Sequence, residues 1–175
     1  MNLQNNRTKA IPERLVHAYD RMLQRAEQTL GSAAEHPEAA LKHALDAARE
    51  EAVKLGELTV EEADRVHDFV THDLYDVGQQ LATQEREIAD LLRLNLLLVE
   101  NELLDRFTKL AQAAKLEFRH LEKAKRRFDE WHTGEVTTIG TLRCRSCGEH
   151  LHFERTGSIP PCPKCHATVY ERVKE

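Results

Sequence analysis

Two Cys-x-x-Cys pairs near the C-terminal end of the sequence constrain the fold of this chain more than any other feature. Cys144 and Cys147 form the first pair, Cys162 and Cys165 form the second, and fourteen residues separate the pairs. Two residues between cysteines allow a tight turn to direct both sulfurs at one point, so two such turns supply four thiolates to a tetrahedral ion. The separation is close to the range of about 15 to 20 residues typical of zinc sites built in this way. The spacing therefore predicts one structural zinc ion bound by these four cysteines.

The same cysteines could instead form redox-active pairs or remain free thiols. A redox Cys-x-x-Cys motif normally lies on a βαβ scaffold, and the sequence predicts none. Residues 1–14 lack the apolar core of a secretory signal, so we expect a cytoplasmic protein in a reducing compartment where disulfides are disfavoured. Four thiolates would leave no coordination position for a catalytic water, so we expect His150, His152 and His166 to be surface residues rather than ligands.

The residues around the cysteines predict three short strands. Residues 141–145 lead into the first turn, residues 151–154 alternate apolar and polar side chains, and residues 168–173 are rich in β-formers. Gly148 can adopt a positive φ after the first turn, and residues 156–157 predict another turn. A module this small has too little core to fold alone. Zinc coordination, worth about 10 kcal/mol or more in comparable peptides, is expected to supply much of its folding free energy.

This region also resembles a known family. The residues that carry the resemblance are Gly134-Glu135-Val136, Gly140-Thr141-Leu142, Cys144, Cys147-Gly148, Leu151, Phe153, Thr156-Gly157, Ile159-Pro160-Pro161-Cys162-Pro163 and Cys165. They resemble the YbeL-like zinc-ribbon proteins of bacteria. The resemblance implies a metal-binding ribbon on a helical N-terminal region, in a family without an established biochemical activity. His166 departs from the many ribbon turns that carry Gly after the second cysteine.

The rest of the chain predicts amphipathic helices. Charged residues make up 31% of the sequence and aromatic residues only 5%, a balance that favours helices over a sheet-rich globule. Apolar residues recur every three or four positions over residues 11–30, 37–55 and 60–81. The positions expected to be buried in the second and third of these helices are Leu41, Leu45, Ala48, Ala52, Leu55, Val60, Ala63, Val66, Val70, Leu74, Val77 and Leu81.

Turn and capping residues divide these helices. Gly31 and Ser32 are expected to end the first helix and Gly56 to end the second, and Pro37 fits the first turn of the second. Thr59 and Glu62 have the spacing of a capping box, in which each side chain accepts a hydrogen bond from the other residue's backbone N–H. The third helix is therefore expected to begin at this point.

The strongest periodic signal runs through residues 88–128. Neither Pro nor Gly occurs within residues 79–133, so a single helix over residues 84–132 is permitted, with a length of about 70 Å. An apolar stripe of this length is expected to pack against another helix. We therefore predict a mainly α protein, with long antiparallel helices forming a bundle or coiled coil in residues 1–133 and a small β zinc ribbon in residues 134–175.

Two other groups of polar residues could bind a metal. Glu117 and His120 match half of the carboxylate–histidine pattern of di-iron bundles, but the sequence has no second copy. His67 and His72 are five positions apart and lie on different faces of a helix, so we interpret both as surface histidines. Neither group is expected to form a metal site.

The charge pattern gives weak support for nucleic-acid binding. The net charge is −5, which creates no general attraction to nucleic acid or to an anionic membrane, and no stretch approaches the roughly 20 apolar residues needed to span a bilayer. One basic segment could contact phosphates, although acidic residues dilute it. Its cations are Lys115, Arg119, Lys123, Lys125, Arg126 and Arg127.

These features favour a non-enzymatic zinc protein whose helices provide a surface for self-association or for a protein partner and whose ribbon acts as an interaction module. No phosphate loop, nucleophile elbow or acid–base pair indicates an enzyme or a small-molecule substrate. The alternative is a transcription- or RNA-associated regulator that contacts RNA polymerase or nucleic acid, by architectural analogy with coiled-coil zinc-finger factors. Loss of salt-sensitive binding after neutralisation of Lys123, Arg126 and Arg127 would identify it. An enzyme with a pocket between its helices is the third hypothesis.

Overall fold

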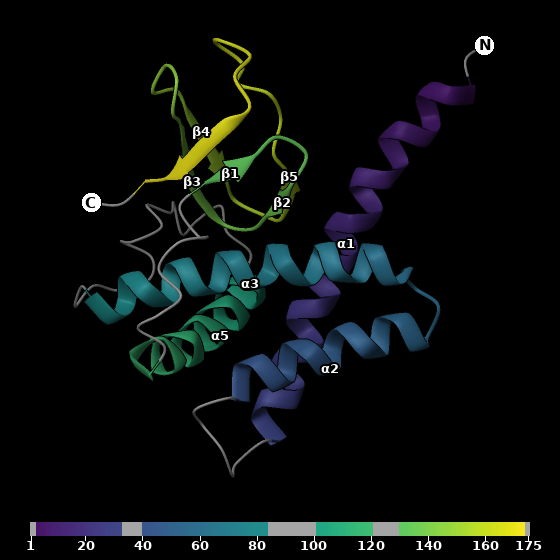
Figure 1. The fold of residues 1–175 in the computed structure, drawn as a ribbon, viewed down its shortest axis with the longest axis vertical. Coiled ribbons are helices and arrows are strands. Elements are labelled where there is room, and N and C mark those ends of the chain that lie inside the picture. The colour runs from purple at the N-terminus through teal and green to yellow at the C-terminus, as the bar shows by residue number, and fades with distance from the viewer. Residues whose placement is uncertain (1–2, 33–39, 84–100, 121–129, 174–175) are drawn as a thin grey trace.

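The computed structural model describes residues 3–32, 40–83, 101–120 and 130–173. Within these ranges, four helices pack in an antiparallel manner and are followed by two small antiparallel sheets (Figure 1). This confirms the predicted mainly α architecture with a C-terminal β module. None of the described helices is long and apolar enough to cross a membrane. The helices are α1 (Leu3–Ser32), α2 (Ala40–Lys54), α3 (Val60–Thr83) and α5 (Asn101–His120).

Six short strands form the ribbon. The larger sheet has the strand order β1-β6-β3-β4, and β2 pairs with β5 in a separate ladder. Gly157 pairs with Thr137 in that ladder, so the turn predicted at residues 156–157 is wrong, and the chain bends at residues 154–155 instead. The strands are β1 (Trp131–His132), β2 (Val136–Thr137), β3 (Gly140–Cys144), β4 (His150–Phe153), β5 (Gly157–Ser158) and β6 (Val169–Arg172).

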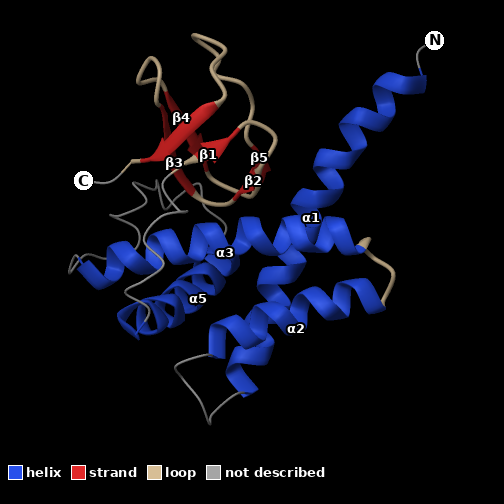
Figure 2. Ribbon diagram, viewed as in Figure 1, coloured by secondary structure: helices blue, strands red, loops and turns tan. Residues whose placement is uncertain are grey.

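The ribbon lies against one side of the helical body. Strands β2 and β5 contact α1, and β2 also contacts α3. Figures 1 and 2 show the ribbon above α3, with α2 and α5 below it. Helices α1 and α3 are therefore the central elements, because each contacts the other three described helices and the ribbon.

Backbone hydrogen bonds explain the sharp turn between α2 and α3. Gly56 has a φ of 67°, and the N–H groups of Gly56 and Glu57 donate to the carbonyls of Val53 and Ala52 at 3.0 Å each. This is the Schellman arrangement, in which a left-handed glycine ends a helix. The predicted end of the second helix at Gly56 is therefore confirmed.

The capping box at the start of α3 is also confirmed. Thr59 N–H donates to Glu62 Oε2 at 3.0 Å, and Glu62 N–H donates to Thr59 Oγ1 at 3.2 Å. Two apolar residues beside this turn were expected to be buried, and here the prediction is wrong, since Leu55 is 58% exposed and Val60 is 49% exposed. Both lie at helix ends, where the chain has already turned away from the packed face.

The apolar stripes of the helices form the main core. Every other position predicted for burial in the second and third helices is buried, and Leu103, Phe107, Leu110 and Ala114 of α5 face the same core. Two ribbon residues, Val136 and Ile139, belong to this core as well. The ribbon is therefore packed into the helical body.

The end of the predicted 84–132 helix is wrong, because Trp131 and His132 form strand β1 and pair with Tyr170 and Val169 of β6. Residues 84–100 and 121–129 lie outside the described part of the chain, as does the predicted helix start at Pro37. The division between residues 133 and 134 stays a prediction, although β1 precedes it and joins the ribbon sheet. A coiled coil likewise stays a prediction.

Candidate metal centre

The structure brings the four cysteines of the two Cys-x-x-Cys pairs together. Their sulfur atoms all lie within 4.8 Å of one another. The Sγ–Sγ distance is 3.6 Å between Cys144 and Cys165, and it is also 3.6 Å between Cys147 and Cys162. A tetrahedral ion with zinc–sulfur bonds of about 2.3 Å separates its sulfurs by about 3.8 Å. The cluster therefore fits one metal ion of the size and ligand preference of zinc.

Two turns of the same geometry position these sulfurs. In the first turn, Gly148 N–H donates to the carbonyl of Cys144 at 2.9 Å, and Gly148 has a φ of 76°. In the second turn, His166 N–H donates to the carbonyl of Cys162 at 2.9 Å, and His166 has a φ of 60°. The positive φ predicted for Gly148 is confirmed. His166 adopts the left-handed backbone conformation that ribbon turns usually assign to glycine.

Backbone N–H groups directed at the sulfurs prepare the site for thiolates. Burial alone would raise the pKa of Cys162, but hydrogen bonds from the backbone N–H groups of Cys165 and Lys164 and from the thiols of Cys147 and Cys165 together lower that pKa to about 7. At Cys147 the hydrogen bond from the backbone N–H of Glu149 lowers the pKa, but burial and the other three thiols outweigh it and raise that pKa to about 12. Four negative sulfurs at these distances repel one another, so a cation between them is needed for all four to lose their protons.

The core beneath the cluster is small, and cysteines make up part of it. Tyr170 is fully buried and donates its hydroxyl to the carbonyl of Pro160 at 2.8 Å. Burial first, and then the negative charge of the cysteines, raises the pKa of Tyr170 to about 12. The buried residues of this core are Trp131, Leu142, Cys144, Ile159, Cys162 and Tyr170.

The three histidines near the cysteines do not join the cluster. His150, His152 and His166 are all exposed, as predicted, and the metal-ligand group found in the described residues contains the four cysteines alone. His152 Nδ1 instead lies 3.0 Å from Thr141 Oγ1.

A buried carboxylate lies at the junction of the ribbon and the helices, and it was not predicted from the sequence. Asp73 of α3 is fully buried, and Arg172 of β6, which is 3% exposed, lies with its Nη2 2.7 Å from Asp73 Oδ1. Arg172 Nε also lies 3.3 Å from Asp76 Oδ2. The groups that donate hydrogen bonds to Asp73 are Tyr19 Oη (2.7 Å), Trp131 Nε1 (3.0 Å), Thr137 Oγ1 (2.9 Å), Thr138 N (3.0 Å) and Arg172 Nη2 (2.7 Å).

The interpretation of His72 as a surface histidine is also wrong, because a ribbon residue, Trp131, packs against its ring. Its ring stacks on the Trp131 ring at a centroid distance of 4.2 Å, and the Arg172 guanidinium lies 5.0 Å from the Trp131 ring centroid. The side chain of His67 is only 20% exposed, with Nε2 3.3 Å from Asp46 Oδ1. One signal in the sequence could have found this junction, since Asp73 lies three positions after Val70 and directly before Leu74 within an apolar stripe.

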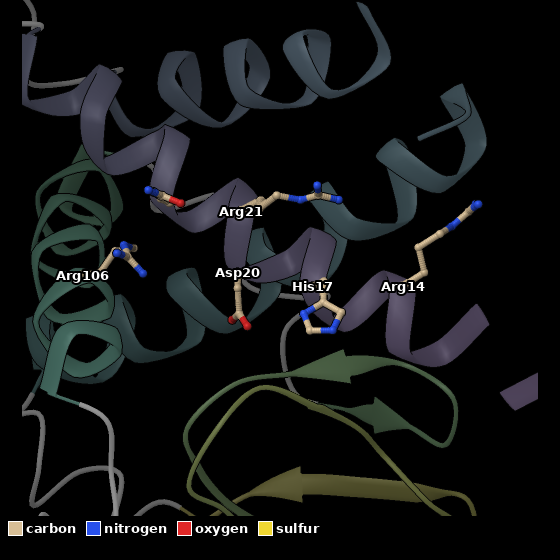
Figure 3. A pocket seen from close by; sticks show the side chains of 6 residues that line it. Arg14, His17, Asp20, Arg21 and Arg106 are labelled. Carbon is tan, nitrogen blue, oxygen red and sulfur yellow. The ribbon is translucent and has the colours of Figure 1, made fainter. Parts of the chain in front are cut away.

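A pocket of about 470 Å³ lies along α1, beside the ribbon and α5. Figure 3 shows His17 and Asp20 directed toward the ribbon strands and Arg14 and Arg21 directed away from them. The lining side chains therefore do not converge on a common point. The residues that line the pocket are Arg14, His17, Asp20, Arg21, Gln24 and Arg106.

The cations of this pocket have acidic neighbours. Arg14 forms an ion pair with Glu62, Arg21 Nη1 lies 3.7 Å from Glu57 Oε1, and Arg106 Nε lies 3.1 Å from Glu27 Oε2. The positions of these side chains do not indicate a reaction in this pocket. The side chains of Glu117 and His120, and all cations of the predicted basic segment except Lys115, lie outside the part of the chain whose side chains the structure describes.

Comparison with known proteins agrees with this geometry. A family model described as a zinc-ribbon containing domain matches residues 28–174. The uncharacterized protein YbeL of Escherichia coli K12 is 27% identical over 128 residues, which cover 73% of this chain and 79% of that relative. YbeL of Escherichia coli O157:H7 shows the same identity and coverage. No solved structure matches the chain. The resemblance found on the ribbon residues is thereby confirmed.

Proposed function

The chain belongs to the family of zinc-ribbon containing domains, and from this premise we propose that it is a non-enzymatic interaction protein whose ribbon is held rigid by one structural zinc ion. Cys144, Cys147, Cys162 and Cys165 would bind that ion. The closed set of four thiolates carries the proposal, because it leaves no coordination position for a substrate or a catalytic water. The zinc would then stabilise a surface instead of activating a reactant.

The placement of the ribbon supports a role in recognition. Its two turns are largely exposed, including Arg145 and Ser146 in the first and Lys164 and His166 in the second. At its other end the ribbon is fixed to α3 through Asp73 and to α1 through the hydrogen bond that Thr156 donates to Asp20. A partner that contacts the turns therefore meets a surface whose geometry is fixed in advance, which lowers the entropy cost of binding.

The charges on the described ribbon favour a protein partner over nucleic acid. Arg145 forms an ion pair with Glu130, Arg143 Nε lies 3.0 Å from Glu171 Oε1, and Lys164 Nζ lies 3.8 Å from Glu149 Oε2. A phosphate-binding surface needs cations whose charge is available to the ligand. Here three of the four exposed cations of the described ribbon face a carboxylate, and Arg155 is the exception.

Metal content tests the first part of the proposal. Protein purified without added zinc should carry close to one equivalent of zinc by mass spectrometry of metals. A content below about half an equivalent, together with free thiols, contradicts a structural zinc site, because zinc coordination in such modules supplies the folding free energy.

Affinity capture tests the second part. We expect wild-type protein to retain specific proteins from a cell extract, and we expect the Lys164→Glu variant at the second turn to lose at least some of them. Lys42→Glu is the matched control, since Lys42 is a similarly exposed lysine on α2 and is likewise ion-paired, to Asp46. A monodisperse monomer that retains no protein contradicts the proposal, whereas salt-sensitive retention of nucleic acid or RNA polymerase supports the regulator alternative.

A further inference from the structure

We propose that metal binding in the ribbon controls the docking of the ribbon on α1 and α3, and that the contact between Asp73 and Arg172 links the two events. The inference rests on the proposed structural zinc. In the metal-bound state the ribbon completes the helical body, and in the metal-free state it separates from that body. The helical core would then respond to a metal ion that it does not touch.

The hydrogen bonds of Asp73 come mostly from the ribbon. One donor, Tyr19 Oη, belongs to α1 and not to the ribbon. The other four belong to the ribbon, and Arg172 supplies the opposite charge at 2.7 Å with its side chain 1% exposed. A fully buried carboxylate without such partners is strongly disfavoured. Asp73 can therefore remain buried only while the ribbon is folded and docked.

The same two strands hold a metal ligand and the charged partner of Asp73. In the ladder between β3 and β6, Cys144 lies opposite Tyr170, and Leu142 lies opposite Arg172. The distance along each strand between these two pairs is only two residues. Metal coordination at Cys144 thus fixes the strand pair whose other end places Arg172 against Asp73.

The ribbon has little else to maintain this strand pair. Two of the six buried residues of its own core are the cysteines Cys144 and Cys162. Of its other buried apolar residues, Val136 and Ile139 contribute to the helical core, and Val173 belongs to neither core. Loss of the metal therefore loosens β3 and β6, removes Arg172 from Asp73, and withdraws two side chains from the helical core. By thermodynamic linkage, loss of the Asp73 contact must weaken metal binding by the same factor.

Trp131 provides a reporter in the unmodified protein, because it is the single tryptophan of the chain and lies between His72 and Arg172 at the junction. Zinc is removed from the full chain with a chelator while metal content and tryptophan emission are measured on the same sample. We expect the emission maximum to shift to longer wavelength as zinc leaves and to return when zinc is added. Amide hydrogen exchange in α3 around Asp73 should accelerate in the same samples. Zinc loss with unchanged exchange in α3 overturns the proposal.

The reverse direction tests the linkage itself. Asp73→Asn should weaken zinc binding by about tenfold or more in competition with a chromophoric chelator, a factor typical of coupled sites. Asp68→Asn is the matched control, because Asp68 lies on the same helix and its side chain is 82% exposed, and this variant should leave zinc affinity unchanged. Gly78→Ala, which disturbs α3 against α5, controls for general loss of helix stability. Unchanged affinity in Asp73→Asn, or an equal loss in Gly78→Ala, overturns the proposal.

These outcomes are separate from the failure of the proposed function. A chain that purifies without zinc contradicts the structural zinc site itself. A chain that holds zinc but shows no response in α3 contradicts only the link between metal and docking. If Asp73→Asn does not fold, the chelation experiment on wild-type protein still decides.

Discussion

At the scale of single residues, the junction of ribbon and helices depends on a buried ion pair with well-directed hydrogen bonds. Removing two charges from water costs more than their attraction returns unless further hydrogen bonds satisfy both groups. Asp73 has five donors, and Arg172 Nη1 also donates to the carbonyl of Ile139 at 3.2 Å. Asp73 is therefore well satisfied, whereas Arg172 Nε makes only its ion-pair contact with Asp76 Oδ2 at 3.3 Å, and loss of Arg172 leaves Asp73 as a buried charge.

Arg172→Met should lower the free energy of unfolding by about 3–5 kcal/mol, because it leaves Asp73 buried without its cation. Denaturant unfolding monitored by circular dichroism measures the change. Arg143→Met is the matched control, since Arg143 is the neighbouring arginine of the ribbon sheet, pairs with Glu171 and has a side chain that is 53% exposed. The control should change stability by less than about 1 kcal/mol. An equal change in the free energy of unfolding in the two variants would show that the buried ion pair contributes no more to stability than the exposed one.

The backbone of His166 makes a second prediction at this scale. With a φ of 60° at this position, His166→Val should destabilise the metal-bound ribbon by about 1–2 kcal/mol, since a β-branched residue is disfavoured in the left-handed region. His166→Gly should be tolerated, as Gly148 is at the equivalent place in the first turn. Thermal unfolding of the zinc-bound variants compares them. A valine variant as stable as the glycine variant would contradict the strain at this turn.

At the scale of elements, the contact of α3 with α5 requires a residue without a side chain. A Cβ at Gly78 would lie 2.7 Å from the Ala114 Cβ and 2.9 Å from the Ala114 carbonyl carbon. The latter is backbone and cannot move without shifting α5. The two helices therefore approach closely at this point because Gly78 and Ala114 are both small.

Gly78→Ala should destabilise the protein by about 1–3 kcal/mol through overpacking, although alanine is the better helix former. Gly31→Ala provides the contrast, because no atom lies within 4 Å of a Cβ at Gly31 in α1. That variant should be neutral or stabilising by up to about 1 kcal/mol. Thermal unfolding of both variants shows whether their signs differ, and a stabilised Gly78→Ala would contradict the close approach.

The turn between α2 and α3 is tied to α1 by an ion pair that should depend on pH. Arg25 donates two hydrogen bonds of 2.9 Å to Glu57, and these bonds lower the pKa of Glu57. A lowered pKa in the folded state stabilises the protein above the unfolded pKa of about 4.3, and this contribution is lost as the pH falls through the folded pKa.

Glu57→Gln should therefore reduce stability by up to about 1 kcal/mol near neutral pH, since the pair is partly exposed. The difference from wild type should shrink as the pH falls through the lowered pKa. The midpoint of denaturant unfolding, measured for both proteins at several acidic pH values, follows this difference. A difference that persists unchanged at the acid end would assign the effect to packing rather than to charge.

At the scale of the whole molecule, the ribbon and the helical body depend on each other. Val136 and Ile139 of the ribbon lie in the helical core, and the carboxylate of α3 lies among ribbon donors. Neither part buries its polar and apolar groups fully without the other. Loss of the metal is therefore expected to reach beyond the ribbon.

Replacing Cys144 and Cys162 together with alanine should abolish zinc binding and make residues 130–173 sensitive to protease. The reason is that the small core under the cluster includes both of these cysteines. Limited proteolysis with mass spectrometry locates the cleavage sites. The double variant His150→Ala and His152→Ala changes exposed residues outside the cluster and should remain as resistant as wild type. A cysteine double variant that resists protease as well as wild type would contradict a role for zinc in stabilising this fold.

The sequence by itself determined the features that depend on local spacing. Two residues between cysteines force a tight turn, Thr59 and Glu62 complete a capping box, and apolar residues every three or four positions define the buried face of α3. Each of these is decided by residues a few positions apart. Such patterns fail at the ends of elements, as they did for Leu55 and Val60, because burial there depends on where the chain goes next.

Only the tertiary structure decided how ribbon and helices meet. Asp73 and Arg172 are 99 residues apart in the sequence, and neither belongs to a local motif. Trp131 extends an apparently helical stretch but forms a strand, because its partner Tyr170 lies far along the chain. The physical reason is that a buried charge is stabilised by whichever donors the fold brings to it, and no spacing rule relates those donors to one another.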